Sequence, residues 1–120
     1  MRIIFFAILL VLSNHLYAQS AQSHNRQAPA ASKYGDVCIK NAKPLKMPNL
    51  TYPQAAYKEG ISGWAIVRYE IADGETTNIV LAESSAAIFN EPSLKATHDM
   101  KFSSDVSVKN CVIAFHFDTP

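Results

Sequence analysis

The chain has 120 residues, of which 48% are hydrophobic and 18% charged, and its formal net charge is +1. This length suits one small globular domain and excludes a second sizeable one. Because 11 Lys and Arg residues nearly balance 10 Asp and Glu residues, bulk charge gives no support to nucleic-acid binding. The low glycine content, four residues, excludes a collagen-like chain.

The amino terminus has the pattern of a secretory signal peptide. Arg2 precedes ten unbroken apolar residues, 3–12, and polar residues then lead to the small residue Ala18. A membrane-spanning helix needs about 20 apolar residues, roughly twice this run. We therefore expect residues 1–18 to be a cleaved signal peptide, with the cut after Ala18 or after Ser20. An uncleaved membrane anchor is the alternative.

A polar leader is expected to follow the signal peptide. Residues 19–33 are rich in Gln, Ser and Ala and contain no large apolar side chain. Such a segment cannot bury enough surface to offset the entropy of ordering it. We expect residues 19–37 to be a flexible leader and residues 38–120 to form the single domain.

Cys38 and Cys111 are the only cysteines. In an exported protein they are expected to form an intramolecular disulfide, with two buried free thiols as the alternative. Zinc binding is not supported, because the two cysteines and the histidines lack the short ligand spacing of structural zinc sites.

The first half of the domain predicts a short helix and a hairpin. Pro53 suits the first turn of a helix over residues 53–59, and Gly60 suits its end. Residues 63–73 alternate between two faces, which predicts a strand with one face buried. Asp73 and Gly74 then suit a tight turn into a second, antiparallel strand over residues 76–83. On that strand Thr77, Ile79 and Leu81 are expected to share one face.

The second half predicts a longer helix and a last strand. Asn90 is expected to cap a helix that runs to about Met100. Its small residues Ser93, Ala96 and Thr97, with Met100, form a stripe that can press on a sheet. Residues 106–117 alternate and predict the third strand. The expected fold class is α+β, a three-stranded antiparallel sheet with two helices packed on one face.

Chemistry-bearing residues do not assemble into a catalytic site. Cys111 and His116 are five positions apart on one strand, so their side chains leave opposite faces. The Ser84-Ser85 pair lacks a nucleophile-elbow setting, and no phosphate-binding or metal-binding motif is present. We expect no enzymatic activity, no cofactor, no metal and no small-molecule substrate.

Trp64, on the opposite strand face from Val67, is expected to cover the back of the sheet, or else to contact a partner.

Five segments together resemble the carboxy-terminal domain of TonB energy transducers, over residues 44–118. They are Tyr52-Pro53-Gln54-Ala55-Ala56, Gly60-Ile61-Ser62-Gly63-Trp64-Ala65-Ile66-Val67-Arg68-Tyr69, Ala72-Asp73-Gly74, Glu83-Ser84-Ser85 and Met100-Lys101-Phe102. In that family the same pieces occur in this order, as a tyrosine-proline helix, a glycine-rich step into a hairpin, a Ser-Ser connector and a helix that ends in an aromatic-basic-aromatic run. Met100 and Ser103 stand where the family has tryptophan and proline.

The resemblance implies a periplasmic protein-binding module. Because residues 3–12 fit a cleaved signal peptide and not the membrane helix of the family's transducers, we expect the module to stand alone. In the family, a short extended peptide of an outer-membrane transporter, the TonB box, is added to the sheet edge beside the last strand. An open edge offers main-chain hydrogen bonds and alternate side-chain pockets to such a peptide. The expected partner-binding residues are Val108, Asn110, Val112, Ile113, Ala114, Phe115, His116 and Phe117. The alternatives are a structural protein of the envelope that pairs this edge with a second copy, forming a homodimer, and a small secreted hydrolase.

Overall fold

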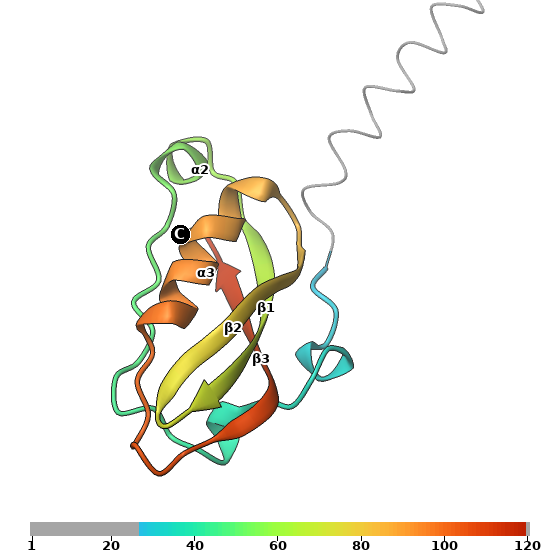
Figure 1. The fold of residues 1–120 in the computed structure, drawn as a ribbon. Helices are drawn as coiled ribbons and strands as arrows, with labels where there is room; N and C mark the ends of the chain where they lie inside the picture. The colour runs from blue at the N-terminus through green and yellow to red at the C-terminus, as the bar shows by residue number, and fades with distance from the viewer. Residues whose placement is uncertain (1–26, 120) are drawn as a thin grey trace, which may run out of the picture.

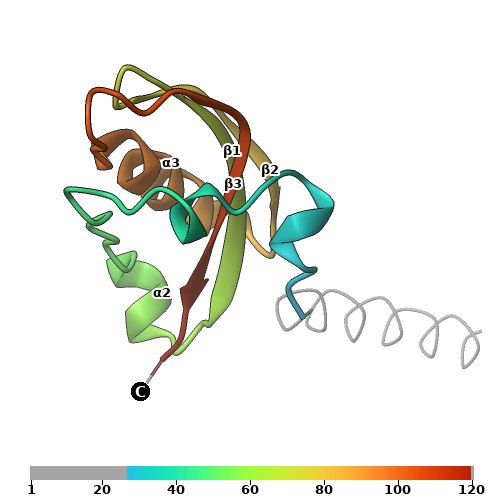
Figure 2. The same ribbon diagram turned by 90° about the horizontal axis from the view of Figure 1, so that it is seen from below.

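The computed structural model describes residues 27–119, which form a three-stranded antiparallel sheet with its helices on one face. The strands are β1 (Gly63–Ala72), β2 (Glu75–Ser84) and β3 (Val108–Phe117), in the spatial order β2-β1-β3. The main helix α3 (Asn90–Asp99) and the single-turn helix α2 (Gln54–Lys58) lie on the front face (Figures 1 and 2). The predicted fold class is confirmed.

Three short 3-10 turns complete the elements of residues 27–119: η2 (Ala31–Lys33), η3 (Cys38–Lys40) and η4 (Ala87–Phe89). The proposed signal peptide, residues 1–18, and the first part of the leader lie outside the described residues. Within the described part of the chain, no helix is long and apolar enough to cross a membrane.

The β1–β2 hairpin closes at the predicted turn. Asp73 and Gly74 both have left-handed backbones, with φ of 52° and 82°, which is the conformation that a two-residue hairpin loop requires. Ala72 pairs with Glu75 across the turn. The hairpin therefore follows from two residues that tolerate positive φ.

The pairing of β1 with β2 and the pairing of β1 with β3 both shift register at the same level of the sheet. Opposite the middle of β1, Asn78 on β2 and Asn110 on β3 each adopt a left-handed backbone, with φ of 48° and 62°. A bulge reverses the face on which the following residues lie. As a result Thr76, and not the predicted Thr77, shares the front face with Ile79 and Leu81. The Thr76 hydroxyl is buried there and donates to the carbonyl oxygen of Thr97 at 2.9 Å.

The predicted small-residue stripe of α3 packs on the sheet. Ser93, Ala96, Thr97 and Met100 have no solvent exposure. The predicted N-cap is wrong: Asn90 is the first helical residue, no side chain caps the helix, and the preceding turn η4 leads directly into it. Asn90 Oδ1 is buried and has no hydrogen-bond partner among the described residues.

Aromatic rings fill the end of the core nearest α2. The Phe89 and Phe117 rings stack with their centroids 4.5 Å apart, and Tyr52 meets the Phe117 ring edge-on at 5.6 Å. Gly63, the first residue of β1, faces this cluster, and a Cβ atom there would overlap the Phe89 ring and lie 2.5 Å from the Ser85 hydroxyl oxygen. The absence of a side chain at Gly63 lets Phe89 pack against the strand.

We expect Gly63→Ala to lower the free energy of unfolding by about 3 kcal/mol, because overpacking a rigid aromatic contact forces strain on the backbone. Gly60→Ala is the control, since a Cβ at Gly60 meets no atom within 4 Å. Gly60→Ala should lower the free energy of unfolding by only roughly 1 kcal/mol, because a non-glycine residue is strained in a left-handed backbone. Urea unfolding of both variants measures the difference, and equal costs would contradict the packing role of Gly63.

The Tyr69 hydroxyl is buried without a hydrogen-bond partner among the described residues, and the residue is only 2% exposed. Burial raises the pKa of this phenol to about 12. Because the folded state holds the proton more tightly than the unfolded state, this phenol adds no pH dependence to the stability below pH 10, and the folded state loses stability as the pH rises from 10 towards 12.

We expect Tyr69→Phe to raise the free energy of unfolding by about 1 kcal/mol at pH 7, because it removes an unsatisfied buried polar group. The variant should also lose the part of the alkaline destabilisation that comes from this phenol, about 1 kcal/mol at pH 11. Tyr57→Phe, at a position that is 54% exposed, should change neither quantity. Unfolding curves at pH 7 and pH 11 test this, and a Tyr69→Phe variant less stable than the original protein at pH 7 would refute it.

Candidate partner-binding edge

The outer edge of β3 is defined by the direction of its backbone groups. In an antiparallel strand the N–H and C=O groups of one residue point to the same side, and those of the next residue point to the opposite side. The amide N–H of Val112 and the carbonyl of Asn110 point away from β1, since both bond to Asp36 outside the sheet. The register from Val112 to Phe117 is regular, so the main-chain groups of Ala114 and His116 also point outwards.

The side chains of the eight predicted binding residues divide between the two faces. Ile113, Phe115 and Phe117 are buried in the front core together with Cys111. Val112 and Ala114 face the back of the sheet, whereas Val108, Asn110 and His116 are exposed. A partner can therefore reach the side chains of four of the eight, the three exposed residues and the half-buried Ala114. Among the four buried residues, Val112 still points its own N–H outwards, to Asp36.

The Cys38–Cys111 disulfide is present, as predicted, with Cα atoms 5.4 Å apart. Cys111 is fully buried in the core and Cys38 nearly so. His116 is exposed on the other side of the strand. The two candidate catalytic residues therefore lie on opposite faces, and the sulfur of Cys111 is already bonded.

Residues 27–38 wrap around β3, and we refer to them as the strap. They cross the back of the sheet through η2, round the edge of β3, and reach the front face at η3 (Figure 2). At the edge, the N–H of Asp36 donates to the Asn110 carbonyl and the N–H of Val112 donates to the Asp36 carbonyl, both at 2.8 Å. Asp36 forms a parallel bridge with Cys111.

On the back face the strap covers a small apolar cluster. Trp64, Ile66 and Val112 are buried there. Partly buried strap residues pack over them: Ala28, Ala31, Tyr34 and Val37. The Tyr34 hydroxyl donates to a carboxylate oxygen of Glu83 on β2. Trp64, which is 4% exposed, covers the back of the sheet as predicted and is itself covered.

The strap includes the second half of the segment that composition predicts to be a flexible leader. Ala28 and Ala31 pack against the back-face cluster, and Tyr34 and Val37 supply the larger apolar contacts that residues 19–33 lack. No side-chain pattern in the sequence identifies Asp36, because it holds its place at the β3 edge through backbone groups alone. The disulfide is the one sequence signal that places this segment beside β3.

The part of the edge that remains open is short. Among residues 27–119, no segment other than β1 pairs with Ala114 or His116. These two residues present two N–H donors and two carbonyl acceptors in a row, enough for a partner strand of about four residues. Ala114 is half-buried and His116 is exposed, so a partner would meet a small apolar side chain and an imidazole.

Comparison with known proteins identifies the family to which this domain belongs. The family model for the Gram-negative bacterial TonB protein C-terminal matches residues 48–118. The chain belongs to the TonB C-terminal domain family. Domains of this family bind proteins in the periplasm and are not enzymes. A search of curated protein sequences found no match.

Two solved structures are similar to this TonB C-terminal domain. One is the solution NMR structure of the TonB C-terminal domain of Pseudomonas aeruginosa, with 27% identity and a TM-score of 0.57 over 65% of this chain and 86% of that one. The other is the TonB2 protein of Vibrio anguillarum, with 18% identity and a TM-score of 0.55 over 79% of this chain and 95% of that one. The second likeness concerns the fold alone.

Proposed function

We propose that this protein binds an extended segment of an envelope protein, such as a TonB-dependent outer-membrane transporter, by adding it to the outer edge of β3 in support of transport. The observation that carries this proposal is the pair of outward-pointing residues, Ala114 and His116, which no other segment among residues 27–119 occupies. Strand addition uses such main-chain groups for affinity. We further propose that residues 1–18 are a cleaved signal peptide that exports the protein to the periplasm.

Membership of the TonB family supports the class of partner. Transporters of the outer membrane are the proteins with which domains of this family generally interact. The disulfide also favours an oxidising compartment outside the cytoplasm. Self-pairing of the same edge in a homodimer is the competing function, because an open edge is a template for any strand.

The proposal is tested by titrating isotope-labelled protein with seven-residue peptides copied from the amino-terminal segments of outer-membrane transporters of the same organism. We expect amide chemical shifts to change most at Ala114 and His116, with little change at Val80 on the opposite edge strand. Changes centred on β2, or no changes with any peptide, would contradict the proposal. Shifts that change on dilution of the protein without peptide would indicate self-pairing.

A further inference from the structure

The strap already makes the contacts that a partner strand would make at the first half of the β3 edge. Asp36 accepts from the Val112 N–H and donates to the Asn110 carbonyl, both at 2.8 Å, and its parallel bridge to Cys111 gives it the geometry of an added strand. Four residues of β3 point outwards: Asn110, Val112, Ala114 and His116. The strap therefore occupies the first two of them.

Two local features fit the strap to this position. Gly35 has no room for a side chain, since a Cβ atom there would lie 2.7 Å from the Asn110 carbonyl oxygen. Three residues later, Cys38 is bonded to Cys111 on β3 itself. The disulfide thus joins the occupying segment to the strand whose edge it occupies.

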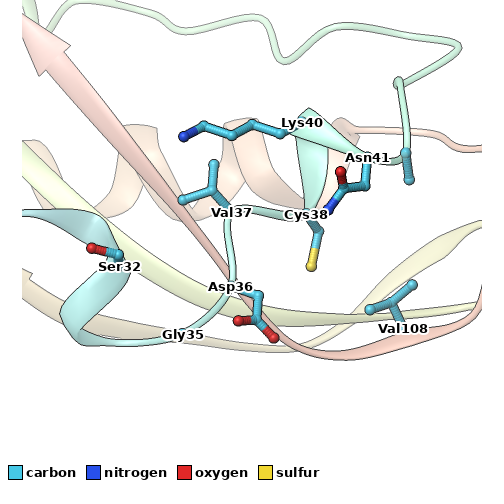
Figure 3. Close-up of a pocket in the computed structure, with 9 residues that line it drawn as sticks. Ser32, Gly35, Asp36, Val37, Cys38, Lys40, Asn41 and Val108 are labelled. Atoms are coloured by element: carbon cyan, nitrogen blue, oxygen red, sulfur yellow. The ribbon is translucent and has the colours of Figure 1, made fainter.

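A surface cavity of about 530 Å³ opens beside this bond. Cys38 lines it together with the strap residues Gly35, Asp36 and Val37 and with Val108 of β3, and Figure 3 shows the Cys38 sulfur among these residues. Cys38 is 4% exposed, whereas Cys111 has no solvent exposure. A thiol that enters this cavity would therefore reach the Cys38 sulfur before the Cys111 sulfur.

We propose that the strap is an intramolecular occupant of the partner edge and that reduction of Cys38–Cys111 releases it. The inference rests on the proposed function of the β3 edge. In the oxidised protein a partner pairs with the short run at Ala114 and His116. In the reduced protein the open edge extends back to Asn110, which doubles the number of outward-pointing residues available.

The reductant is a dithiol. Its thiolate attacks the Cys38 sulfur, forms a mixed disulfide and displaces the Cys111 thiolate, which takes up a proton. The second thiol of the reductant then displaces Cys38 as a thiol. Two electrons and two protons pass to the protein, and the dithiol becomes a disulfide.

Amide hydrogen exchange tests the release without any partner. After reduction with dithiothreitol, the Val112 amide, which bonds to Asp36, should exchange at least about ten times faster than in the oxidised protein. The Ile113 amide, which faces β1, is the internal control, because it reports the general loss of stability that reduction causes. The ratio of the Val112 rate to the Ile113 rate should therefore rise at least about tenfold on reduction. An unchanged ratio would overturn the proposal, because the strap would then not be a separately releasable segment.

Gly35→Ala tests the same inference with the disulfide intact. The added Cβ must push the strap away from Asn110, so Val112 exchange should accelerate about tenfold while Ile113 exchange stays constant. A folded Gly35→Ala variant with full Val112 protection would contradict the proposed occupancy. Since neither exchange measurement needs a peptide, a failure of peptide binding in both redox states would count against the proposed function alone.

Discussion

Breaking the Cys38–Cys111 bond is expected to lower the free energy of unfolding by roughly 4 kcal/mol. The bond joins residues 73 positions apart, and the chain-entropy account gives this value for the loop that it closes in the unfolded state. For a domain of this size the loss corresponds to a fall in Tm of about 15–30 °C. Thermal unfolding with and without dithiothreitol measures it.

The double variant Cys38→Ala and Cys111→Ala is the control for this measurement. Its Tm should lie near that of the reduced protein and should not respond to dithiothreitol. A reduced protein whose Tm stays within a few degrees of the oxidised value would contradict the stabilising role of the bond.

Ala114→Pro is expected to abolish partner binding while the domain stays folded. Proline removes the outward-pointing N–H at this position, and no bond to β1 is lost because β1 pairs through the main-chain groups of Ile113 and Phe115. Proline is tolerated at the edge of a sheet when the missing donor faces outwards. Titration with the transporter peptides should show at least a tenfold loss of affinity, and circular dichroism should show an unchanged fold.

Ala114→Ser is the matched control, because it keeps the N–H and adds only a hydroxyl. It should bind nearly as well as the original protein. If Ala114→Pro is folded and binds the peptides normally, strand addition at this position is wrong. If Ala114→Ser loses binding as well, the side chain rather than the main-chain donor carries recognition.

Local signals were sufficient to predict most of the fold. The alternation over residues 63–73 and the Asp73-Gly74 turn specify the hairpin, because each depends on residues next to one another in the chain. The stripe formed by Ser93, Ala96, Thr97 and Met100 correctly indicates the buried face of α3. Cys38 and Cys111 could be paired because no other cysteine competes.

The bulges and the strap could not be predicted in this way. Asn78 and Asn110 adopt left-handed backbones inside strands, and asparagine by itself indicates a turn as readily as a bulge. Asp36 occupies the β3 edge through its main chain, for which no side-chain pattern exists. The back-face contacts of the strap depend on Val112 meeting Trp64 and Ile66 in space, although Val112 lies more than 40 positions further along the sequence.

The central claim is that the β3 edge at Ala114 and His116 meets a transporter in the living cell. A photo-reactive phenylalanine placed at the exposed position His116 tests it, with the same group at Val80 on the opposite edge strand, 58% exposed, as the control. We expect a covalent adduct with an outer-membrane transporter from position 116 and none from position 80. An adduct from position 80 alone, or an adduct from position 116 only with a second copy of this chain, would contradict the account.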